Sequence, residues 1–171
     1  DFNLVGWRNG VLAQCGAEWE RRLARFAIAC ASETLITYYL KAMAEDRSIQ
    51  LICHEVTRTH AVDEWSHSSV FSSVATDIVQ GLSNRERSYL RSIILKTVQM
   101  FANNELGAWS TVFTMVGMPH ARDILHDVGD SNEIGVYTDS VQSLIDRIGL
   151  AGRNLGGSVA LVSSVLEEMQ A

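Results

Sequence analysis

The sequence has a single proline, Pro119, and no excess of positive charge. One proline in 171 residues leaves long stretches without a helix breaker, which favours long helices over turn-rich β structure. The formal net charge of -6 gives no reason to expect nucleic acid or an anionic membrane surface as a partner. No apolar run reaches the ~20 residues that span a bilayer, and no signal peptide is recognisable, so we expect a cytoplasmic protein.

Cysteine is also scarce. Cys15, Cys30 and Cys53 are odd in number and form no CxxC pair. This pattern favours three buried, reduced thiols in a cytosolic protein.

The spacing of apolar residues predicts an all-α protein with one domain over residues 1–171. Apolar positions three and four residues apart predict long helices over 17–44, 49–82 and 85–115. Ser83 and Glu86 form a predicted capping box before the third of these helices. Beyond Pro119 we predict shorter helices over 122–128, 136–148 and 158–169, with loops at 130–135 and 152–157. Short connections make neighbouring helices antiparallel, so a helical bundle follows.

The second long helix has a predicted inward stripe that includes Ile52, Val56 and Val74. His60, Glu64 and His67 interrupt this stripe, spaced by four and three residues. An α-helix turns about 100° per residue, so these three side chains lie within roughly 60° of one another on one face. Two imidazoles and a carboxylate on one stripe indicate a metal site. The alternative is a buried polar network of neutral histidine and glutamic acid.

Glu33 interrupts the apolar stripe of the preceding helix. A carboxylate there costs several kcal/mol unless it is paired, protonated or bound to a metal. Glu33 and the Glu-x-x-His of Glu64 and His67 form half of the ligand set of ferritin-like di-metal proteins. Mixed carboxylate and imidazole ligands suit iron or manganese, although affinity alone does not exclude zinc.

Four further polar residues are candidates for supporting roles near this site. Asp63 could orient a histidine, although a surface position is equally compatible with the sequence. Thr37 and Thr57, each one turn from a ligand, could line a pocket or pack between helices. Glu105 falls on the inner stripe of the third helix, where it could accept a hydrogen bond from a ligand, be a further ligand itself, or be solvated or salt-bridged. Among hydrophobic residues, candidate pocket walls are Leu40, Val56 and Phe71.

The segments SETLITYYL, around Glu33, and THAVDEWSHSSVF, from Thr59 to Phe71, resemble the di-iron arylamine N-oxygenases. That family has a ligand glutamate in an SETLI-like helix and, about 27 residues later, the pattern His-x-x-Asp-Glu-x-x-His. Glu33, His60, Asp63, Glu64 and His67 match at that separation. The resemblance covers roughly residues 17–80.

The resemblance implies a ferritin-like bundle that holds two iron ions. Glu33, Glu64 and His67 would be ligands, and His60 would be the additional terminal ligand of the family. The implied reaction uses O2 and an external electron donor to convert an arylamine to its hydroxylamine and nitro products.

One departure from the family pattern concerns the rest of the ligand set. The family has another glutamate and a second Glu-x-x-His on two helices before the SETLI helix. This chain has only about 30 residues there, and Glu64 begins its only Glu-x-x-His. We therefore expect an incomplete half of the bundle, completed by the rest of a longer protein, as the start at Asp1 suggests, or by a partner chain. A symmetric homodimer would also complete the set.

Two other function classes remain open from the sequence. A related di-metal oxidase could act on a different amine. A non-catalytic helical module could bind a structural metal or serve in assembly. Metal content separates the oxygenase from the module, because the oxygenase needs two irons per assembled site.

Overall fold

The computed structural model describes residues 4–130 and 142–150, without the side chains of 102–106 and 128–130. Five helices are defined there: α1 (Leu4–Ala13), α2 (Glu18–Glu45), α3 (Leu51–Gly81), α4 (Asn84–Met115) and α5 (Ala121–Asp130). Residues 142–147 are also helical, and no strand occurs in the described part of the chain. The predicted all-α bundle is confirmed.

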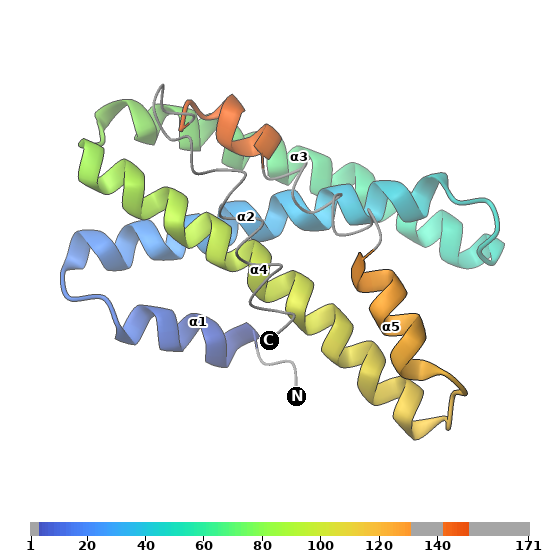
Figure 1. Cartoon of the computed structure of the whole chain (residues 1–171). Helices are drawn as coiled ribbons and strands as arrows, with labels where there is room; N and C mark the ends of the chain where they lie inside the picture. The colour runs from blue at the N-terminus through green and yellow to red at the C-terminus, as the bar shows by residue number, and fades with distance from the viewer. Residues whose placement is uncertain (1–3, 131–141, 151–171) are drawn as a thin grey trace.

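Helix α2 lies at the centre of the arrangement (Figure 1). It packs against α3 on one side and against α4 on another, while α1 contacts α2 and α5 contacts α4. Only five residues separate α2 from α3, so the two form an antiparallel hairpin. This hairpin carries the four main ligand candidates, with Glu33 on α2 and His60, Glu64 and His67 on α3.

Side chains at two helix starts satisfy backbone N–H groups that have no partner within the helix. Glu20 Oε2 accepts hydrogen bonds from the backbone N–H groups of Gly16 (2.8 Å) and Ala17 (3.1 Å). At α4, Ser83 Oγ accepts from the Glu86 N–H, and Glu86 Oε2 accepts from the Ser83 N–H at 2.8 Å. The capping box predicted for Ser83 is confirmed.

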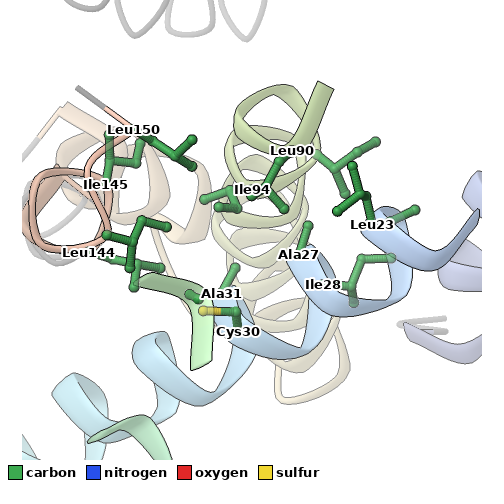
Figure 2. Close-up of a cluster of buried hydrophobic side chains, with 14 of the residues drawn as sticks. Leu23, Ala27, Ile28, Cys30, Ala31, Leu90, Ile94, Leu144, Ile145 and Leu150 are labelled. Atoms are coloured by element: carbon green, nitrogen blue, oxygen red, sulfur yellow. The ribbon is translucent and has the colours of Figure 1, made fainter. Parts of the chain in front are cut away.

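The hydrophobic core forms where small residues of α2 let α4 approach closely. Ala27 and Ala31 are fully buried, and Leu90 and Ile94 of α4 pack near them (Figure 2). Residues 142–150 close a third side of this core with Leu144, Ile145 and Leu150 (Figure 2). The core therefore fixes the position of α2, and with it the position of Glu33.

Several boundaries differ from those predicted. Helix α1 was not predicted, because the first ten residues show no clear apolar period. Of the predicted helix over 136–148, residues 142–147 are helical and residues 136–141 lie outside the described residues. The predicted segments 152–157 and 158–169 lie outside the described residues, as does nearly all of 130–135. Among the described helices, none is both long enough and apolar enough to cross a bilayer.

The buried face of α3 is not the one predicted. Thr57, Ser68, Ser72, Ala75 and Val79 are buried, mostly with small side chains that allow a close approach to α2. By contrast, Ile52, Val56 and Val74, predicted to be inward, are 68%, 62% and 44% exposed. The prediction followed the larger hydrophobic residues, whereas the contact with α2 uses the smaller ones. The larger ones form an uncovered apolar stripe beside the candidate ligands.

The cysteines also divide into two environments. Cys15 and Cys30 are buried, as predicted, but Cys53 is exposed near the start of α3, so the prediction for Cys53 is wrong. Burial raises the pKa of the Cys30 thiol to about 11. The thiolate is the reactive form of cysteine, so Cys30 is protected both by burial and by protonation.

We predict that iodoacetamide modifies Cys53 much faster than Cys30 in the native protein at neutral pH. Peptide mass spectrometry over a time course measures the two rates, and Cys53→Ser should remove the fast phase. Unfolding in denaturant should bring the Cys30 rate close to that of Cys53. Equal native rates at the two sites would contradict the burial of Cys30.

Candidate metal centre

Glu33 on α2 meets Glu64 and His67 on α3. One ligand atom from each of the three lies within 4.8 Å of the others. His67 Nδ1 is 3.3 Å from Glu64 Oε2 and 3.8 Å from Glu33 Oε2. Three residues from the two interrupted stripes thus converge on one small space.

His60 approaches the same centre from the preceding turn of α3. Its Nε2 lies 3.0 Å from Glu64 Oε1, whereas His67 contacts the other oxygen, Oε2. Glu64 is therefore held between two imidazoles, one on each carboxylate oxygen. His60 does not join the compact group of Glu33, Glu64 and His67, a position that fits an additional ligand at one side.

Thr37 ties the two helices together at this level. Its hydroxyl lies 2.7 Å from the Glu33 carbonyl oxygen of its own helix and 3.0 Å from the Glu64 carbonyl oxygen of α3. The contact with α3 fixes the register of the two helices where Glu33 and Glu64 must meet. Thr37 thus has a positioning role, consistent with its predicted place near the site.

The two carboxylates of the site are largely covered by protein, whereas the two histidines are open to solvent. The side chains of Glu64 and Glu33 are 13% and 29% exposed, whereas those of His60 and His67 are 55% and 59% exposed. The Glu33 Oε2 atom is itself buried and has no hydrogen-bond partner. A buried acceptor without a partner is costly, so this oxygen is a ready ligand for a cation.

The two carboxyl groups differ in proton affinity. Burial raises the pKa of Glu33, and its interaction with Glu64 adds to the rise. Burial also opposes ionisation of Glu64, but contacts with Glu33, His60 and His67 outweigh it and lower the pKa of Glu64. Two carboxyl groups in one space do not both ionise readily, so Glu64 loses its proton at a lower pH than Glu33.

This donor set fits a transition-metal cation. A divalent ion would balance the charge of the two carboxylates and give Glu33 Oε2 a partner. His67 would be a nitrogen ligand, and His60 an additional one. Mixed oxygen and imidazole ligands suit iron or manganese, and carboxylates can bridge two ions.

The remaining predicted residues lie farther from this centre or cannot be placed. Asp63 is exposed, and no described hydrogen bond links it to His60 or His67. Thr57 is buried in α3. Glu105 belongs to α4, but its side chain is outside the described part.

A cavity of about 360 Å³ adjoins the site at His60. Its walls include Ile36, Tyr39 and Leu40 of α2 together with Trp109 of α4. Leu40 was predicted as a pocket wall, but Trp109 was not, because only the packing of α4 beside α2 brings it to this place.

We predict that Glu33→Gln stabilises the metal-free protein at neutral pH. The raised pKa of Glu33 means that its ionisation weakens the folded state as the pH rises through that value. Glutamine keeps a hydrogen-bond donor beside Glu64 without the charge. The melting temperature of the variant should exceed that of the wild type at pH 7, and the gap should close as the pH falls through about 4.3, the ordinary value for glutamic acid.

Glu45→Gln is the matched control, since Glu45 is an exposed carboxylate of the same helix. Its pH profile should follow the wild type, because exposed ion pairs contribute little. A destabilised Glu33→Gln apoprotein at neutral pH would argue against a strained carboxyl pair.

The sequence of this chain is similar to those of known N-oxygenases. The sequence profile of the family described as P-aminobenzoate N-oxygenase AurF matches residues 1–149. A curated relative, the 4-aminobenzoate N-oxygenase of Streptomyces thioluteus, is 27% identical over 118 residues, which is 69% of this chain. The match covers 35% of the relative, so the chain spans about a third of that protein's length. The chain belongs to the p-aminobenzoate N-oxygenase family.

Proposed function

We propose that this chain forms part of a di-iron oxygenase that inserts oxygen at the nitrogen of an arylamine. The observation that supports the proposal is the meeting of Glu33, Glu64 and His67 in one small space. The Glu33 Oε2 atom there is buried and has no hydrogen-bond partner. Membership of an N-oxygenase family supports the reaction type.

Glu33, Glu64 and His67 would hold the metal, with Glu64 the expected bridging carboxylate and His60 an additional ligand. Iron at this position would supply the redox chemistry that activates O2. The first oxidation balances when one oxygen atom joins the amine nitrogen, giving the hydroxylamine, and the other leaves as water. That step needs two electrons and two protons, which an external donor would provide.

The chain's own residues would hold the ligand helices in place and provide an apolar surface beside the metal centre. The Thr37 hydroxyl holds the two ligand helices in register. The apolar wall formed by Ile36, Leu40 and Trp109 beside His60 would offer apolar contacts to an aromatic ring. The Thr37 contact and the apolar wall would together position an amine nitrogen near Glu33 and Glu64.

The remaining ligands must come from outside the described structure. One glutamate and a second Glu-x-x-His would complete a four-helix di-iron site. The uncovered stripe of Val56, Val70 and Val74 on α3 supports a covering pair of helices, because apolar residues at this spacing favour burial. The rest of a longer chain is the expected source, and a partner chain or a second copy would serve equally.

We predict that Glu64→Ala lowers metal affinity at least tenfold. Residues that merely orient ligands contribute about 10–100-fold, and Glu64 is itself the central carboxylate. Calorimetric titration with Mn²⁺ and elemental analysis after loading with Fe²⁺ under anaerobic conditions measure the effect. Glu55→Ala is the matched control, because Glu55 is an exposed carboxylate of α3. Equal metal content in wild type and Glu64→Ala would refute the site.

We predict that the iron-loaded assembly converts a substituted aniline to its hydroxylamine under ¹⁸O2 with a chemical reductant. Mass spectrometry should find one labelled oxygen atom on nitrogen, and activity should track two irons per assembled site. The intact mass of the active sample identifies the origin of the missing helices. An assembly that holds two irons but never oxidises an amine nitrogen would point to another di-metal oxidase, and one with no iron to a non-catalytic module.

A further inference from the structure

The cavity beside His60 belongs to the same face of α2 as the metal centre. Ile36 and Leu40 follow Glu33 by three and seven positions, so all three lie on one stripe of the helix. His60 lines the cavity and also contacts Glu64. A molecule that occupies this space therefore lies directly beside the ligands.

The size and walls of the cavity fit a substituted benzene ring. Its volume of about 360 Å³ falls at the lower end of the range of small-molecule sites. Tyr39, Phe101 and Trp109 offer aromatic surfaces. Trp109 in turn contacts Phe113, with ring centroids 5.6 Å apart, which supports its orientation.

No lysine, arginine, aspartate or glutamate is among the described residues that line this cavity. A carboxylate that packs against an apolar wall without a cationic partner loses favourable solvation. The wall as described thus disfavours a ring that bears a charged group.

Cationic side chains gather elsewhere on the same helix pair. Lys41, Arg58 and Arg147 line a second cavity of about 460 Å³, together with Tyr38 and Trp65. At about 100° per residue, the α2 residues of this second cavity lie on roughly the opposite face from those of the first. None of the four candidate ligands lines it. Thr37 also lines this second cavity and contacts both Glu33 and Glu64, so the two cavities flank the metal centre on either side. The cationic side chains belong to the second cavity and not to the described wall of the first.

We propose that this site selects arylamines whose ring substituents are uncharged, with the ring held in the cavity beside His60. The inference rests on the proposed N-oxygenase function and narrows its substrate class. It separates this chain from the relative named for 4-aminobenzoate, whose ring carries a carboxylate at neutral pH.

The decisive comparison uses 4-aminobenzoate and its methyl ester, which keep the same ring and amine and differ in charge. Calorimetric titration of the full chain should give at least tenfold tighter binding of the ester. In the iron-loaded assembly the ester should also have the higher kcat/KM. Equal or tighter binding of 4-aminobenzoate would overturn the inference, whether or not either compound is oxidised.

A pair of variants on the α4 wall isolates the effect of charge. Trp109→Arg introduces a cation, and Trp109→Gln removes the same indole without one. Trp109→Arg should shift the affinity ratio toward 4-aminobenzoate by at least tenfold relative to Trp109→Gln. Identical ratios in the two variants would show that the substituent does not contact this wall.

If 4-aminobenzoate proves to be oxidised faster than its ester, the inference fails while the proposed function stands. If neither compound is oxidised by an assembly with two irons, the proposed function fails. The binding ratio then still decides the charge preference of the cavity.

Discussion

Two carboxyl groups occupy one poorly hydrated space between α2 and α3, and the surrounding structure follows from that constraint. Glu33 and Glu64 cannot both carry a charge there without a cation or a proton between them. The Thr37 hydroxyl keeps the two helices in register at this level, and the alanine-lined contact between α2 and α4 fixes the helix that carries Glu33. The fold thus maintains an arrangement that is unfavourable without a positive charge.

The two cavities beside the α2–α3 hairpin differ in charge. The uncharged cavity at His60 lies on one side of the metal centre, while Lys41, Arg58 and Arg147 line a cavity on the other side. Cations beside Glu33 would compete with a metal ion for its carboxylate. Their absence from the described wall at His60 leaves that carboxylate available.

The sequence was sufficient to predict the long helices and the Ser83 cap, because each depends on local spacing. It also predicted the meeting of Glu33 with Glu64 and His67, because a short connection makes their two helices antiparallel neighbours. It was not sufficient to predict which side of α3 is buried. Close packing through Ser68, Ser72 and Ala75 outweighs the hydrophobicity of Val56 and Val74, and single-helix periodicity does not register that preference. Trp109 was missed for a related reason, since only tertiary packing brings it to the site.

The gradient of exposure across the centre sets an order of events for an arriving ion. A hydrated cation that came from solvent would meet the exposed imidazoles of His60 and His67 first, while it was still largely hydrated. It would reach the buried Oε2 atom of Glu33 only after it had lost more of its water. The histidines would therefore be the entry point for the ion, and Glu33 the last ligand that it meets.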